Sequence, residues 1–165
     1  MSTALIWQTV STNSADTLNL GKQLGAKLPG GQVIELVADL GGGKTTFTQG
    51  LAQGLGSLDQ VSSPTFTINK IYSASGGRQI HHFDFYRLSE PGIIADQLQE
   101  SLADPKVITV VEWSDVVKDV LPPNRLTIKF ELTSGDPDER LITINYPESL
   151  QPIIKSLESE SGVRP

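Results

Sequence analysis

The stretch that decides the fold reads Ala38-Asp39-Leu40-Gly41-Gly42-Gly43-Lys44-Thr45-Thr46. It fits the phosphate-loop pattern of a glycine-rich turn followed by lysine and threonine, with Ala38 in the place of the first glycine. Glycines let backbone N–H groups approach a phosphate closely, while the lysine supplies charge and the hydroxyl a magnesium ligand. The alternative is a glycine-rich turn with a solvated lysine.

The segments on either side supply the strand and the helix that a phosphate loop requires. Residues 32–37 form a short, mostly apolar run, which predicts a buried strand. After the glycines, Phe47, Leu51 and Leu55 recur at every fourth position, which predicts a helix. In this context we expect nucleotide binding by Asp39, Leu40, Gly41, Gly42, Gly43, Lys44, Thr45 and Thr46.

Apolar runs and turn residues alternate along the rest of the chain. Further strands are predicted over 4–10, 65–72, 78–85, 106–112, 125–132 and 140–146. Further helices are predicted after 11–14, over 91–103 and 114–121, and from 147 onward. The expected fold class is α/β, a P-loop NTPase-like three-layer fold with a mixed central sheet. We expect a single P-loop ATPase domain over 1–157 and a polar, frayed tail over 158–165.

Composition excludes several classes of protein. The chain has 165 residues, a net charge of −6, a pI near 4.8 and no cysteine, which excludes a disulfide scaffold and a thiol nucleophile. No basic residue precedes the apolar stretch at the N-terminus, and no apolar run is long enough to span a bilayer. We therefore expect a soluble, intracellular protein that does not bind nucleic acid unaided.

Phosphate-loop chemistry also needs an acidic residue at the end of another strand to hold magnesium. Glu112 ends the apolar run 107–111 and is the first candidate, and Asp84 is the second. Trp113 would pack either on the nucleotide or in the core. Arg87 would either neutralise phosphate charge or pair with an acid.

Two adjacent histidines precede Asp84. His81 and His82 point to opposite faces of a strand, so they cannot bind one metal together. We interpret both as structural, with His82 on the face of Asp84.

These motifs together resemble the bacterial TsaE (YjeE) family, the ATPase of tRNA threonylcarbamoyladenosine biosynthesis. That family carries G-D-L-G-A-G-K-T-T, then S-P-T-[FY]-T, then H-[FM]-D-x-Y-R, then a strand ending in E-W. The matching stretches here are 38–46, 63–67, 82–87 and 112–113, and the resemblance runs from about Thr17 to Tyr146. Ala38 replaces a glycine and Gly42 an alanine, and neither change removes a side chain with chemistry.

The resemblance implies a role for each matching residue. Lys44 would bind phosphates, Thr45 and Glu112 would hold Mg²⁺, and Asp84 would be needed for hydrolysis by orienting water. Lys44, Asp84 and Glu112 are thus the implied catalytic residues, and Trp113 is a nucleotide-binding candidate.

Two further segments have implied roles. Ser63-Pro64-Thr65 would be a switch segment near the γ-phosphate; the alternative is a strand-entry turn made rigid by proline. Ser14 and Thr17 would lie on the adenine side, with N-capping as the alternative.

The resemblance implies a cytoplasmic ATPase that uses ATP and Mg²⁺ and is slow and partner-dependent. Its nucleotide cycle would support a complex with TsaD-like and TsaB-like proteins, without direct tRNA binding and without a membrane. A small-molecule kinase shares the loop, although we find no arginine-rich lid, and a nucleotide-gated scaffold with negligible turnover is the third possibility. A GTPase is disfavoured because Asn69-Lys70-Ile71-Tyr72 lacks the aspartate of the N-K-x-D guanine signature.

Overall fold

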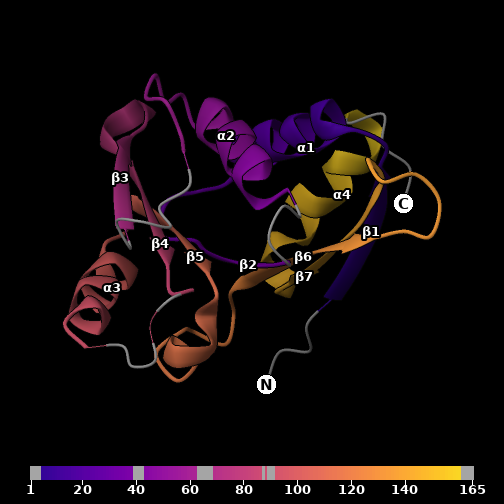
Figure 1. The fold of residues 1–165 in the computed structure, drawn as a ribbon. Helices are drawn as coiled ribbons and strands as arrows, with labels where there is room; N and C mark the ends of the chain where they lie inside the picture. The colour runs from indigo at the N-terminus through magenta and orange to yellow at the C-terminus, as the bar shows by residue number, and fades with distance from the viewer. Residues whose placement is uncertain (1–4, 39–42, 63–68, 87, 89–91, 161–165) are drawn as a thin grey trace.

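The computed structural model describes residues 5–38, 43–62, 69–86, 88 and 92–160, with side chains as far as residue 157. A seven-stranded sheet of order β1-β7-β6-β2-β5-β4-β3 runs through the molecule (Figure 1). The strands are β1 Leu5–Ser11, β2 Val33–Val37, β3 Asn69–Ser73, β4 Gln79–Asp84, β5 Val107–Glu112, β6 Leu126–Leu132 and β7 Arg140–Tyr146. The helices are α1 Ser14–Lys27, α2 Lys44–Gly54, α3 Ile94–Ala103 and α4 Gln151–Glu160, with 3-10 turns η1 Ser75–Gly77, η2 Ser114–Val117 and η3 Glu148–Leu150.

The sheet is mixed, as the sequence predicts. Strands β6, β2, β5 and β4 are parallel neighbours at its centre. Strands β1, β7 and β3 pair antiparallel at the two sides. The carboxyl ends of the central strands therefore meet at one edge, where α/β proteins bind ligands.

Helices cover the two faces of this sheet unequally. Alternate strand residues point to opposite faces, so Ile34 packs with the core beneath α1, α2 and α4, whereas Val33 packs on the other side. On that other side Leu98 of α3 and Val117 of η2 join Val33 in a smaller core. Three layers result. The layer formed by α3 and η2 is the smaller of the two helical layers and leaves Lys129 of β6 exposed.

Glycines bring α1 and α2 into close contact, side by side in Figure 1. A Cβ atom built on Gly50 of α2 would lie 2.0 Å from the carbonyl oxygen of Leu18. In the reverse direction, a Cβ atom on Gly21 of α1 would lie 2.3 Å from the carbonyl oxygen of Phe47. The close approach of the two backbones fixes the position of α2 against α1.

Three predicted boundaries need correction. Helix α3 begins at Ile94 and not at 91, because Gly92 has a φ of +55° that a right-handed helix does not admit; Pro91 lies outside the described residues. The predicted helix over 114–121 is only the 3-10 turn η2. Helix α4 continues beyond residue 157 to Glu160. No helix among the described residues is long and apolar enough to cross a bilayer.

Candidate functional site

The first turn of α2 lies close to the carboxyl end of β2. Gly43 precedes this helix with a φ of 106°, a left-handed conformation that favours glycine. Within the described residues no side chain caps this end, and an uncapped helix N-terminus attracts anions such as phosphate. The predicted loop residues Asp39, Leu40, Gly41 and Gly42 lie outside the described residues.

Lys44 begins α2, and its side chain is buried. The ammonium nitrogen donates a hydrogen bond to the carbonyl oxygen of Ala38 at 2.8 Å and lies 3.9 Å from Oε1 of Glu112. It also lies 4.5 Å from the centroid of the Trp113 ring, within range of a cation–π interaction. A buried ammonium group beside a helix N-terminus is suited to phosphate recognition.

The structure brings the two predicted acids, Asp84 and Glu112, together at the edge of the sheet. Asp84 ends β4, Glu112 ends β5, and the two residues are partners in the parallel register. Their exposed fractions are 5% and 3%. One oxygen of Asp84 accepts a hydrogen bond from the backbone N–H of Tyr86 at 2.9 Å. Two buried carboxyl groups on neighbouring strands therefore face the region of Lys44.

A cavity of about 260 Å³ opens beside the first turn of α2. It is lined by Asn13, Ser14, Thr17, Gly43, Thr46, Asp138 and Arg140. The predicted Ser14 and Thr17 thus share one cavity with the phosphate-loop residues Gly43 and Thr46. Asp138 and Arg140 were not predicted, because no local pattern shows that the β6–β7 hairpin folds against the start of α1.

N-capping does not account for Ser14 or Thr17. The N-cap of α1 is Asn13, whose side-chain oxygen accepts a hydrogen bond from the backbone N–H of Asp16 at 2.9 Å. The Thr17 hydroxyl lies 2.7 Å from the hydroxyl of Ser11. Ser14 is the first residue of the helix and is exposed.

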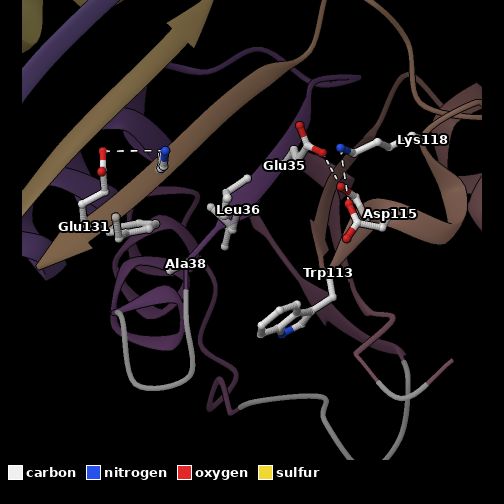
Figure 2. A pocket seen from close by; sticks show the side chains of 11 residues that line it. Glu35, Leu36, Ala38, Trp113, Asp115, Lys118 and Glu131 are labelled. Atoms are coloured by element: carbon white, nitrogen blue, oxygen red, sulfur yellow. Dashed lines mark hydrogen bonds and ion pairs between the residues drawn. The ribbon is translucent and has the colours of Figure 1, made fainter. Parts of the chain in front are cut away.

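A larger cavity, of about 420 Å³, lies between the end of β2 and the turn after β5. Figure 2 shows the Trp113 ring extending into it toward Ala38. Its rim is charged and carries Asp115, Lys118, Lys129 and Glu131. Trp113 therefore lines this cavity on one side and contacts Lys44 on the other.

Trp113 has a φ of 55°, the one non-glycine residue with positive φ in the described part of the chain. This conformation costs about 1–3 kcal/mol for a bulky side chain and is found at functional sites. The Tyr86 ring packs on the indole at a centroid distance of 4.8 Å. The next residue, Ser114, donates a hydrogen bond to Oε2 of Glu35, which holds the turn to β2.

Glu35 was not predicted, although a carboxylate in the middle of an otherwise apolar strand is a signal in the sequence that could have identified it. Its Oε1 accepts hydrogen bonds from Nε of Arg125 and Oγ1 of Thr127, both at 3.0 Å. Burial by itself would raise the pKa of Glu35, but the hydrogen bonds from Ser114, Arg125 and Thr127 and the positive charge of Arg125 together lower it. Glu35 thus stays ionised and ties η2 to the centre of the sheet.

The structure adds a contact to His82 that the sequence did not suggest. His82 is fully buried on β4, and its Nε2 atom forms a hydrogen bond with Oε2 of Glu112. His81 lies on the opposite face, with its Nε2 3.0 Å from the side-chain oxygen of Gln79. The structure thus brings His82, and not His81, into contact with a predicted site residue.

Ser63, Pro64 and Thr65 of the predicted switch segment, and Arg87, lie outside the described residues. Thr45, in the first turn of α2, is half-buried.

Comparison with known proteins gives consistent matches. The family model "Threonylcarbamoyl adenosine biosynthesis protein TsaE" matches residues 11–142. A Bacillus subtilis "tRNA threonylcarbamoyladenosine biosynthesis protein TsaE" is 40% identical over 139 residues, covering 84% of each chain. A Treponema pallidum protein of the same description is 34% identical and is covered to 90% of its length. The crystal structure of YdiB from B. subtilis superposes with a TM-score of 0.73 at 32% identity, covering 98% of this chain and 99% of that one.

The central parallel strands and the helix that follows β2 define an α/β protein with the P-loop NTPase-like fold. Within that class, the family model and the similar relatives are decisive, and the chain belongs to the TsaE family.

Proposed function

We propose that this protein is an Mg²⁺-dependent ATPase whose nucleotide cycle supports the synthesis of threonylcarbamoyladenosine in tRNA. The observation that carries the proposal is the convergence of Lys44, Asp84 and Glu112 at one edge of the sheet, next to the first turn of α2. A positive side chain for phosphate, a carboxyl group for magnesium and a second one for water are among the parts that ATP hydrolysis uses. Membership of the TsaE family indicates the pathway, which is threonylcarbamoyladenosine biosynthesis.

The two ends of ATP would occupy different parts of the site. The phosphates would lie at the N-terminus of α2, where Lys44 and the backbone N–H groups neutralise their charge. The nucleoside would then extend past Thr46 into the smaller cavity, since that cavity is lined by Gly43 and Thr46. Ser14, Asp138 and Arg140 would supply hydrogen bonds there, and Trp113 would flank the phosphate side.

Glu112 and Thr45 would hold a magnesium ion. Among the described residues no group of three or more His, Cys, Asp or Glu side chains could hold a metal by itself. This fits Mg²⁺, which proteins bind through one or two carboxylates together with phosphates and water. Oε1 of Glu112 accepts no hydrogen bond from the described residues and so has the lone pairs that a hard cation needs. The ion would supply positive charge to the phosphates, and Asp84 would orient the attacking water.

The ATPase proposal includes partners and a location. TsaD-like and TsaB-like proteins of the same pathway are the proposed partners, and the cytoplasm is the proposed location. With a net charge of −6 the isolated protein would not bind tRNA directly, because such binding depends on neutralising phosphates. Titration of labelled tRNA at low salt tests this point, and micromolar, salt-sensitive binding by the protein alone would contradict it.

The activity itself is tested by incubating the protein with ATP and Mg²⁺, alone and with the two partner proteins. Release of inorganic phosphate that increases with the partners is the expected result. Phosphate found on a small molecule instead would favour the kinase. Nucleotide binding without turnover under any of these conditions would favour the scaffold.

A further inference from the structure

His82 and Glu112 form a buried contact between neighbouring strands. His82 has an exposed fraction of 0%, and its partner across the β4–β5 register is Val110, so Glu112 lies two residues further along β5. The Glu112 side chain therefore leans back along the strand to reach Nε2 of His82 with its Oε2 atom. Side chains at these alternate positions share one face of the sheet.

The surroundings of His82 decide which of its two ring nitrogens donates a hydrogen bond. Its Nδ1 atom is buried and has no hydrogen-bond partner among the described residues. A proton on Nδ1 would leave a buried N–H group unpaired, which is costly. We therefore assign a proton to Nε2, so that this nitrogen donates to Oε2 of Glu112.

Because of this hydrogen bond, the two carboxylate oxygens of Glu112 have different partners. Oε2 is committed to His82, and Oε1 points toward the ammonium nitrogen of Lys44 at 3.9 Å. The hydrogen bond from His82 fixes the plane of the carboxylate, so that one oxygen is paired with the ring while the other faces Lys44. The ring thus holds the carboxylate in an orientation that leaves one oxygen facing the phosphate side of the site.

We propose that His82 is a positioning residue, which presents Oε1 of Glu112 to magnesium; this rests on the proposed function. Hydrogen bonds from outer residues to metal-binding carboxylates orient them, and their loss costs roughly 10–100-fold in metal affinity. His82 itself touches neither the metal nor the nucleotide.

The test compares three variants in binding a fluorescent, non-hydrolysable ATP analogue at increasing Mg²⁺ concentration. In His82→Ala the Mg²⁺ midpoint should rise by about 10–100-fold, with affinity for the analogue in the absence of Mg²⁺ unchanged. His82→Gln should keep the Mg²⁺ midpoint close to that of the parent protein, because its side-chain amide can still donate a hydrogen bond. His81→Ala, the matched control on the opposite face, should behave as the parent protein.

An unchanged Mg²⁺ midpoint in folded His82→Ala would overturn the proposal, and so would equal losses in folded His82→Ala and His82→Gln. Imidazole nitrogen-15 NMR of the parent protein near neutral pH is a second measurement, which needs no variant. It should show a proton on Nε2 of His82, and an Nε2 that carries no proton would overturn the proposal even if the variants fail to fold. A parent protein that does not bind the analogue at all would refute the proposed function, and with it this role.

Discussion

The ammonium nitrogen of Lys44 lies 4.5 Å from the centroid of the Trp113 ring, while the same nitrogen is hydrogen-bonded to the carbonyl oxygen of Ala38. The indole thus covers the group that we expect to bind phosphate. A phosphate that draws Lys44 toward itself must change the environment of this ring.

Tryptophan fluorescence should therefore report nucleotide binding. Addition of ATP should change the emission of the parent protein and leave that of Trp113→Phe nearly unchanged. Trp7 is the internal control, because it is buried in the core beneath α1, α2 and α4 and remains in the variant. An equal response in parent and variant would place the nucleotide away from Trp113.

Lys44→Ala should lose at least tenfold in affinity for ATP, because charge-assisted hydrogen bonds contribute about 1.5–3 kcal/mol each. Isothermal titration calorimetry measures the affinity, and circular dichroism checks that the variant is folded. The matched control is Lys155→Ala, which removes an exposed lysine of α4. ATP binding that survives in folded Lys44→Ala would show that the first turn of α2 is not the phosphate site.

Glu112→Gln should raise the Mg²⁺ concentration required for phosphate release, because an amide is a weaker ligand than a carboxylate for a hard cation. Glu100→Gln, on the exposed side of α3, is the control and should match the parent protein. Coincident Mg²⁺ titrations for Glu112→Gln and the parent would transfer the metal-binding role to Asp84 or another residue.

Gly50→Ala should destabilise the fold through the contact of α2 with α1. The new methyl group would lie 2.0 Å from the carbonyl oxygen of Leu18 and 3.0 Å from the backbone nitrogen of Lys22, so the helices must move apart. Overpacking of this kind costs about 1–3 kcal/mol of unfolding free energy, measured by urea denaturation. At Gly135 a Cβ atom meets nothing within 4 Å, and Gly135→Ala should leave stability within about 0.5 kcal/mol of the parent.

Glu35 should make the stability of the protein depend on acid pH. Burial raises its pKa, but the hydrogen bonds and the charge of Arg125 outweigh burial, and the folded-state pKa is lower than the unfolded one. Its stabilising contribution is thus complete above the unfolded pKa, about 4.3, and is lost as the pH falls through the folded pKa. Thermal unfolding from pH 7 to pH 3 should show a smaller acid-induced decrease for Glu35→Gln than for the parent. Glu131→Gln, an exposed control, should follow the parent curve.

Local patterns in the sequence determined the elements that build the site. The apolar run before the glycines and the four-residue spacing after them predicted β2 and α2, since both signals depend only on neighbours along the chain. Its place at the end of an apolar run likewise made Glu112 a candidate to hold magnesium. The boundaries of β6 and β7 were predicted to within one residue.

Only the tertiary structure decided which of these residues meet. The order of β4 beside β5, and their register, places Asp84 opposite Glu112 and His82 within reach of it, and strand order depends on crossovers that no local pattern specifies. The hydrogen bond from Ser114 to Glu35 joins residues 79 positions apart, and the cavity beside α2 is completed by Asp138 and Arg140 from a distant hairpin. Local propensity acts over a few residues, whereas a site is assembled by packing across the whole sheet.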